Sequence, residues 1–218
     1  MKLSKMFLNL KTSLFCVLFT AAIGSGCING KQNTSPKLFN GKDLAGWEIT
    51  DFAGSGEIKV KDGELHIGMG ELISGINLAH DNIPRSNYEL EAEALKVDGD
   101  DFFCAITFPL GETFATFIPG GWGGSVVGIS SIDGMDAAEN ETASFKKFEK
   151  NQWYRFKIRV TDEKIQCFID KEMAVDLPLE DRNIALRPGP IELSVPIGFA
   201  SFQCISKIRN INLRSIKP

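Results

Sequence analysis

Apolar and polar residues alternate with a period of two along most of the chain from Lys37 onward. The clearest case is WYRFKIRV (153–160), whose even-numbered residues are all apolar and whose odd-numbered residues are one tryptophan and three basic side chains. Successive side chains of a β-strand point to opposite faces, so this segment predicts a strand with one buried and one solvated face.

Two neighbouring segments extend this pattern into a small sheet. KIQCFI (164–169) follows a turn at 161–163, which predicts a hairpin, and a further turn at 170–172 leads into MAVDLPL. In YELEAEAL (88–95) the residues Glu89, Glu91 and Glu93 share one face. We interpret these carboxylates as partners of the basic face of 153–160 in a cross-strand charge ladder.

Further short alternating segments are separated by Gly, Pro, Asn and Asp: GELHIGM, DFFCAITFP, FATFIPG, GSVVGIS, PIGFASFQC and IRNINLRSI. No stretch of ten or more residues keeps a helical period, and no repeat of propeller or solenoid length is present. About ten to fourteen short strands without crossover helices predict an all-β fold, a two-sheet antiparallel β-sandwich.

The N-terminus has the layout of a secretory signal. Three lysines precede an apolar run at 14–23, which is too short to span a bilayer, and small residues then lead to Cys27. GSGC (24–27) resembles the lipobox of bacterial lipoproteins, in which the cysteine is lipidated; ordinary signal cleavage is the alternative. We expect a signal peptide at 1–26, a polar tether at 27–36 and one domain at 37–218. The protein is then exported to the periplasm, outer membrane or cell surface of a bacterium, with a lipid anchor in the membrane.

The length and the net charge of the chain limit the classes of function that it can have. A chain of 218 residues with 43% hydrophobic content suits one domain with a sizeable core. Residues 1–26 hold three lysines and no acid, so 21 Lys and Arg face 28 Asp and Glu in the remainder, a net charge of about −7. Nucleic-acid binding depends on clustered basic residues, so we expect no nucleic-acid partner.

The three cysteines of the expected domain, Cys104, Cys167 and Cys204, each lie in an apolar alternating run. Their spacing contains no CxxC pair, which argues against zinc. We interpret them as small buried hydrophobic residues, with one disulfide plus one free thiol as the alternative.

LFNGKDLAGW (38–47) resembles the opening signature of the DUF1080, or 3-keto-disaccharide hydrolase, family. KVKDGELHI, NYELEAEA, the hairpin at 153–170 and a closing IGFASFQCISKIRNINLRSI follow in the family's order. The resemblance covers roughly 37–218 and implies a concanavalin A-like jelly roll. The polar motifs that typical members place on the concave sheet, NSGI-x-FR and YE-x-Q-x-x-D, are replaced here by DGDDFFCAITFP and by FATFIPGGWGGSVVGISSIDG.

The family resemblance implies cleavage of sugars oxidised at C3. A ketone there acidifies the C2 hydrogen, so a base, an enolate stabiliser and an acid are required. The chain has two histidines, His66 and His80, and these are the candidate catalytic residues. A solvated surface histidine is the alternative for His66, which shares a strand face with Glu64, and a loop histidine without function is the alternative for His80.

IPGGWGGSVVGISSIDGMDAAENET (118–142) is the richest local candidate for a binding site. It lacks the lysine of a phosphate loop and the spacing of an EF-hand, although an irregular site for calcium or a similar divalent metal stays open. A carbohydrate site needs an exposed aromatic ring with convergent polar groups. The candidates are Trp122, Asp133, Asp136, Asn140 and Glu141. Alternatively, Trp122 fills a sandwich edge and the acids solvate a turn.

Two functions of different class follow from these residues. One is a hydrolase or lyase of 3-keto-glycosides, and the other is a non-catalytic carbohydrate-binding module of the cell envelope. Direct glycoside hydrolysis would need a carboxyl pair of defined separation. The ladder E-x-E-x-E at 89–93 differs from the E-x-D-x-x-E pattern of laminarinase-type jelly rolls. Jelly rolls host many functions, so a structural envelope protein that binds no sugar also stays open.

Overall fold

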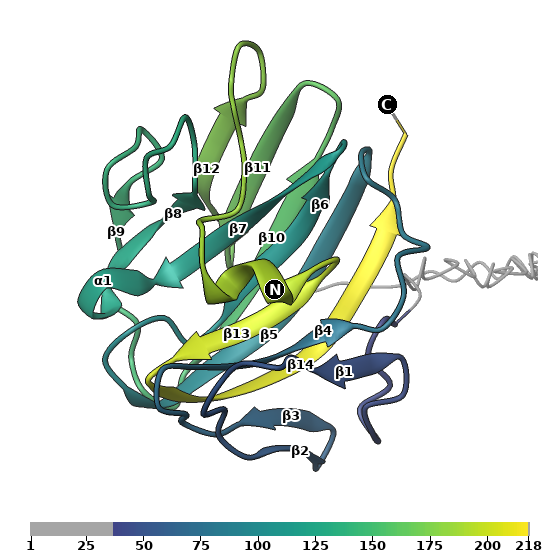
Figure 1. Cartoon of the computed structure of the whole chain (residues 1–218), viewed down its shortest axis with the longest axis vertical. Helices are drawn as coiled ribbons and strands as arrows, with labels where there is room; N and C mark the ends of the chain where they lie inside the picture. Colours follow the sequence, from purple (N-terminus) through teal and green to yellow (C-terminus); the bar gives the residue numbers. More distant parts are fainter. Residues whose placement is uncertain (1–36, 218) are drawn as a thin grey trace, which may run out of the picture. The chain divides into compact units, whose positions relative to one another are not determined.

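The computed structural model describes residues 37–217, which form two antiparallel sheets of seven strands each (Figure 1). The all-β sandwich predicted from the alternating pattern is confirmed. The expected signal peptide (1–26), tether (27–36) and lipidation site (Cys27) lie outside the described residues. Within 37–217, no helix is long and apolar enough to cross a membrane.

Sheet I carries the candidate site. In spatial order, its strands are β1 (Trp47–Ile49), β4 (Ile73–Leu78), β13 (Gly198–Phe202), β6 (Ala105–Leu110), β7 (Thr113–Gly120), β8 (Val126–Ser130) and β9 (Ser144–Phe145). The short α1 segment (Gly121–Gly124) joins β7 to β8, so the glycine-rich stretch forms a hairpin.

Sheet II packs against the inner face of sheet I. In spatial order, its strands are β12 (Glu172–Pro178), β11 (Lys164–Ile169), β10 (Trp153–Val160), β5 (Tyr88–Gly99), β14 (Cys204–Ser215), β3 (Glu64–Ile67) and β2 (Ile58–Lys61). The hairpin of β10 and β11 and the next turn into β12 match the sequence prediction.

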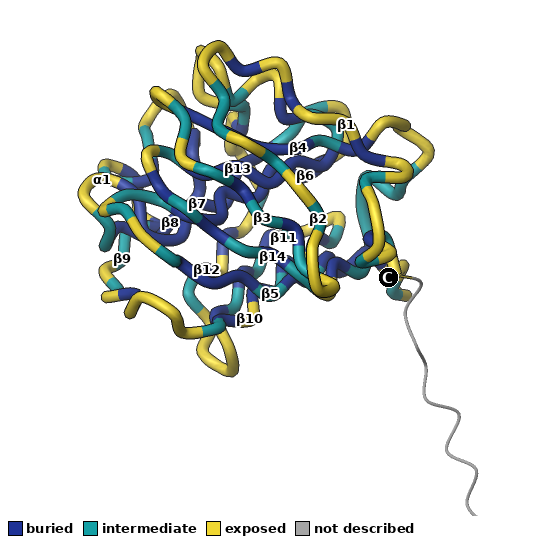
Figure 2. Tube along the Cα trace, turned by 90° about the horizontal axis from the view of Figure 1, so that it is seen from below, coloured by how far each residue is buried: buried dark blue, intermediate teal, exposed yellow. Residues whose placement is uncertain are grey.

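The core lies between the sheets and follows the alternating pattern. On β10 the four even-numbered residues are buried while Arg155 and Arg159 are exposed. The rings of Phe103, Phe148 and Phe156 pack together, with centroids 5.2 to 6.4 Å apart. In Figure 2 the buried positions run along the strands and the exposed positions gather in the loops. Burial of these apolar faces is the main force that holds the sheets together.

The outer face of sheet II carries the charge ladder predicted from the sequence. Strands β5 and β10 place Arg155 opposite Glu93 and Arg159 opposite Glu89. Arg155 forms its ion pair with Glu91 at 2.5 Å, one step along the ladder. Opposite charges side by side stabilise a solvated face only modestly, so this face is structural.

The outer face of sheet I is apolar and partly covered. A second hydrophobic cluster there includes Ile73, Ile118 and Ala200, one from each of three strands. The connection between β12 and β13 runs over this face through the 3₁₀ helix η1 (Pro190–Ser194), which Figure 1 shows in yellow-green in front of the sheet. A Cβ on Gly198 would lie 2.3 Å from the Ser194 carbonyl oxygen, so this glycine permits the close approach of η1.

The three cysteines of the described chain are all buried and free of disulfides. Burial raises the pKa of the Cys104 and Cys167 thiols well above the ordinary range. The interpretation as small buried hydrophobic residues is therefore confirmed, and the alternative of a disulfide is not what the structure contains.

Candidate functional site

A pocket of about 440 Å³ opens on the outer face of sheet I, between η1 and the α1 turn. Its floor comes from strand residues of the second hydrophobic cluster, including Ile73, Ile118 and Phe202. Its polar wall comes from Asp101 and Arg187, and one side is the indole of Trp122. The pocket thus combines an apolar floor with a small number of polar groups, which is typical of small-molecule sites.

The α1 turn holds Trp122 out of the core. Trp122 adopts φ 48° and ψ 57°, a left-handed conformation, and its side chain is 41% exposed. Gly123 donates its backbone N–H to Asp101 Oδ2 at 3.1 Å, which ties the turn to the 99–102 loop. Gly124 has φ 95°, and a Cβ there would lie 2.9 Å from the Asp100 carbonyl oxygen. The glycines therefore allow a tight turn that presents the indole at the pocket.

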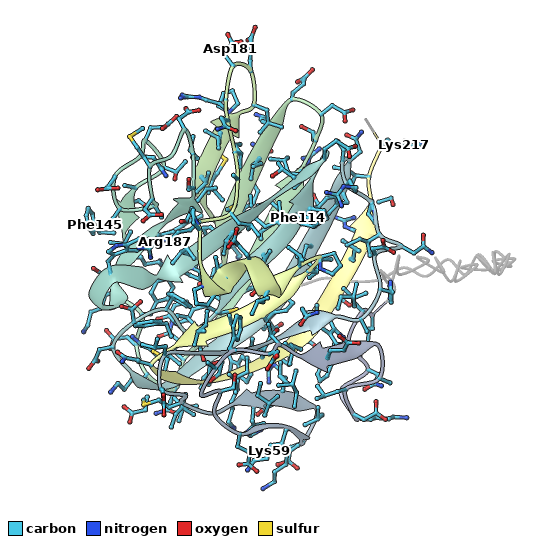
Figure 3. The ribbon with its side chains drawn as sticks, in the orientation of Figure 1. Lys59, Phe114, Phe145, Asp181, Arg187 and Lys217 are labelled. Atoms are coloured by element: carbon cyan, nitrogen blue, oxygen red, sulfur yellow. The ribbon has the colours of Figure 1, made fainter. Side chains whose placement is uncertain are left out.

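Arg187, which is labelled in Figure 3, contacts both Trp122 and the acidic loop, by which we mean residues 133–141. Its guanidinium carbon lies 6.0 Å from the centre of the Trp122 ring. Its Nε lies 3.1 Å from Asp136 Oδ2, and Asp136 Oδ1 accepts a hydrogen bond from Ser130 Oγ at 3.0 Å. Of the sequence-predicted site residues, Trp122 and Asp136 are thus brought together through Arg187.

Two other predicted site residues, Asp133 and Glu141, pair with Arg182 instead. Arg182 Nη1 lies 2.9 Å from Asp133 Oδ2, and Arg182 Nη2 contacts the Glu141 carboxylate. The Asn183 N–H and the Arg182 guanidinium hold the pKa of Asp133 below its usual value. Neither acid lines the pocket. Their place beside Arg182 fits a structural loop contact better than the predicted sugar contact.

Asn140 is a bracing residue inside the acidic loop. It is 5% exposed, and its amide nitrogen lies 2.8 to 3.1 Å from the carbonyl oxygens of Ile129, Met135 and Asp136. Its Oδ1 accepts hydrogen bonds from both the N–H and the hydroxyl of Thr142. Because these bonds occupy the buried amide, Asn140 shapes the loop rather than facing a ligand as predicted.

The two histidines lie away from the pocket. His66 is on the outer face of sheet II, where its Nε2 is 3.6 Å from Glu64 Oε2. His80 is an exposed residue in the loop after β4. The sandwich separates His66 from the outer face of sheet I, and neither of the predicted catalytic histidines lines the pocket.

A metal-binding cluster is not formed by the described side chains. Within 37–217, no three His, Cys, Asp or Glu residues converge at metal-ligand distances. The carboxylates of the acidic loop are instead paired with arginines. Calcium can also take backbone and amide carbonyl oxygens as ligands, so the expected site for calcium or a similar divalent metal stays a prediction.

Sequence reasoning missed Asp101 and Arg187. Asp101 lies in the DGDD segment (98–101), whose acidic residues do not have the spacing of an EF-hand but whose composition is typical of a turn. Arg187 precedes Pro-Gly-Pro in a loop 65 positions after Trp122. Gly and Pro in these two segments are typical of turns and loops, and this is the signal that could have drawn attention to them. Their meeting at Trp122 depends on the β12–β13 connection crossing sheet I, which no local pattern encodes.

The fold is shared with carbohydrate-active proteins. A carbohydrate-binding module, CBM66 from Bacillus subtilis, superposes with a TM-score of 0.51 and 13% identity over 78% of this chain and 96% of the module. A structure from work on endo-acting O-glycanases of the human gut microbiota superposes with a TM-score of 0.54 and 14% identity over 82% of this chain and 97% of that one. At these identities the likeness concerns the fold alone.

Sequence comparison identifies the family. No curated protein matches this chain. The family model of the 3-keto-alpha-glucoside-1,2-lyase-like domain matches residues 34–214, nearly the whole of the domain expected from the sequence. The opening signature at 38–47 and the sandwich described above agree with that match. The chain therefore belongs to the 3-keto-alpha-glucoside-1,2-lyase-like family.

Proposed function

We propose that the pocket beside α1 binds carbohydrate, with Trp122 as the platform for a sugar ring. The exposure of its indole at the edge of the pocket is the observation that carries this proposal. A pyranose has an apolar C–H face that packs on an aromatic ring, while its hydroxyl groups need directed hydrogen bonds. Burying such a ring face removes apolar surface of both partners from water.

The polar groups of the pocket suit the hydroxyl groups of a sugar. Arg187 supplies N–H donors, Asp101 supplies carboxylate acceptors, and Ser130 lies at the pocket beside Asp136. The likeness of the fold to a carbohydrate-binding module supports the same function. Neutral sugars are also compatible with the acidic net charge that argues against nucleic acid.

Screening of the full chain on a glycan array tests this proposal. We expect binding to a restricted set of glycans, with soluble forms of the same glycans competing. Resonances of the Trp122 indole N–H and of the α1 glycines should shift on titration, while those of His66 on sheet II stay unchanged. Absence of glycan binding, or shifts confined to sheet II, would contradict the proposed site.

A second candidate function is cleavage of 3-keto-glycosides, favoured by the family to which the chain belongs. In such a substrate a base takes the C2 proton, the electron pair forms an enolate with the C3 ketone, and the C1–O bond then breaks as the leaving oxygen takes a proton. Asp101 is the carboxylate that lines the pocket and is the candidate base. Arg187 is the candidate cation for the enolate oxygen.

Release of nitrophenol from a nitrophenyl 3-keto-α-glucoside tests this chemistry. We expect turnover by the full chain and a loss of at least about 100-fold in kcat/KM for Asp101→Asn, because an amide cannot accept the C2 proton. His66→Ala and His80→Ala should retain activity and serve as controls. Turnover measured with and without a metal chelator tests whether the reaction requires a divalent metal. Turnover lost in His80→Ala but kept in Asp101→Asn would reverse the assignment.

We further propose export and lipid anchoring through Cys27. The charged N-terminus, the apolar run and the GSGC segment support this proposal. In a bacterial host, the full chain should incorporate labelled palmitate and fractionate with membranes, whereas Cys27→Ala should incorporate none. Labelling that persists in Cys27→Ala would contradict the anchor; Cys16→Ala, within the signal, is the matched control.

A further inference from the structure

Lys96 is a buried cation without a partner in the structure. It is 6% exposed, and on β5 it continues the inward-facing series of Ala92 and Ala94. Among residues 37–217, its ammonium group forms no ion pair with a carboxylate and no hydrogen bond, and its nitrogen keeps contact with solvent at a hollow. Lysines are rarely this buried unless they are paired.

The ammonium group of Lys96 lies at a second hollow, of about 460 Å³, on the other side of the α1 turn from the carbohydrate pocket. A Cβ on Gly124 would lie 3.8 Å from Nζ, which places the ammonium group directly beneath the turn. Ser125 and the ring of Phe148 also line this hollow.

The other two lysines that line the hollow form ion pairs with carboxylates at its rim. Lys147 pairs with Glu149 at 2.8 Å, and Lys150 pairs with Asp98 at 2.7 Å. Both lysines are largely exposed, whereas Lys96 is not. Asp100 is the remaining charged lining residue, and it is exposed and outside ion-pairing distance of Lys96.

The stem of Lys96 is buried, whereas its ammonium group opens onto the hollow, so the charge meets solvent there and no carboxylate. A small oxyanion that entered the hollow would accept a charge-assisted hydrogen bond from this ammonium group, next to a largely buried stem. The Ser125 hydroxyl can donate a further hydrogen bond at the same place. A neutral sugar hydroxyl would offer Lys96 a weaker acceptor.

We propose that the hollow beneath the α1 turn is a binding site for a small oxyanion, a carboxylate or a sulfate group, held by Lys96. The anion is either free in solution or the acidic group of a carbohydrate, such as a uronic acid or a sulfated sugar. The site does not depend on sugar binding at Trp122, although the α1 turn forms a wall of both.

Titration of the full chain with sodium sulfate, sodium glucuronate and glucose, at constant ionic strength set by sodium chloride, tests the site. The readouts are the amide resonances of Gly123, Gly124 and Ser125. We expect saturable shifts with a half-point in the millimolar range or below, and a loss of at least about tenfold in affinity for Lys96→Met. Lys96→Arg keeps the cation and should keep the response, as should the rim control Lys147→Met.

The arms of this experiment separate the sources of the anion. Saturation by sulfate and glucuronate alike identifies a site for a free oxyanion, and saturation by glucuronate alone identifies an acidic sugar. Lys96→Met should fold with a nearly unchanged melting temperature in chloride, since methionine can occupy the space of the buried lysine stem. Equal responses of the wild-type chain and Lys96→Met, or an absence of saturation in the wild type, would overturn the proposal.

Discussion

Replacement of Trp122 by alanine is expected to weaken carbohydrate binding by about 10- to 100-fold, because the stacking surface for the sugar ring is lost. The indole is 41% exposed and lies outside the two buried clusters, so its removal leaves the core intact. Tryptophan and alanine at position 122 must adopt the same left-handed backbone conformation, so the substitution should change the stability of the fold only slightly. The loss should therefore appear in affinity and not in the melting temperature.

Isothermal titration with a glycan identified on the array measures this effect. Phe145→Ala is the matched control, because Phe145 is 78% exposed on the edge strand β9 and does not line the pocket. Trp122→Phe keeps a smaller aromatic face and should recover part of the affinity. Equal affinity of Trp122→Ala and the wild type would show that the sugar platform lies elsewhere.

Replacement of Asn140 by alanine is expected to cost about 2–4 kcal/mol of unfolding free energy. The substitution removes the side-chain donor to the carbonyl groups of Ile129, Met135 and Asp136, of which the last two keep backbone donors. It also removes the acceptor of the Thr142 N–H and hydroxyl. Buried polar groups that lose a hydrogen bond incur their full desolvation cost. Affinity for carbohydrate should also fall, because the same loop holds Asp136 and through it Arg187.

Urea denaturation followed by tryptophan fluorescence measures the stability loss. Glu141→Gln is the control, because Glu141 is exposed and its change should alter the unfolding free energy by less than about 1 kcal/mol. Asn140→Asp preserves the shape but replaces donors with acceptors, so it should be nearly as damaging as alanine. A fully stable Asn140→Ala variant that has lost binding would instead restore Asn140 as a direct sugar contact.

The sequence carried most of the information about the sandwich. Side-chain period and turn residues are local properties, and they predicted β5, β10, β11 and the strands on either side of α1. The facing charges of β5 and β10 predicted their pairing, because opposite charges on neighbouring strands favour that arrangement. For the site, local reasoning identified Trp122, since its glycine neighbours offer no bulk to bury an indole.

The sequence by itself determined the all-β class, the inward and outward faces of the strands and the family's opening signature. It identified Trp122 as a candidate but left open whether its ring is exposed or fills a sandwich edge. Tertiary structure decided which polar residues meet. The β12–β13 connection brings Arg187 to Trp122 and Asp136 and also sends Arg182 to Asp133 and Glu141. The folded chain also buries Asn140 within its own loop and places Lys96 beneath α1, while neither histidine lines the pocket. Such contacts depend on the path of long connections across a sheet, whereas the sequence pattern reports only local periodicity.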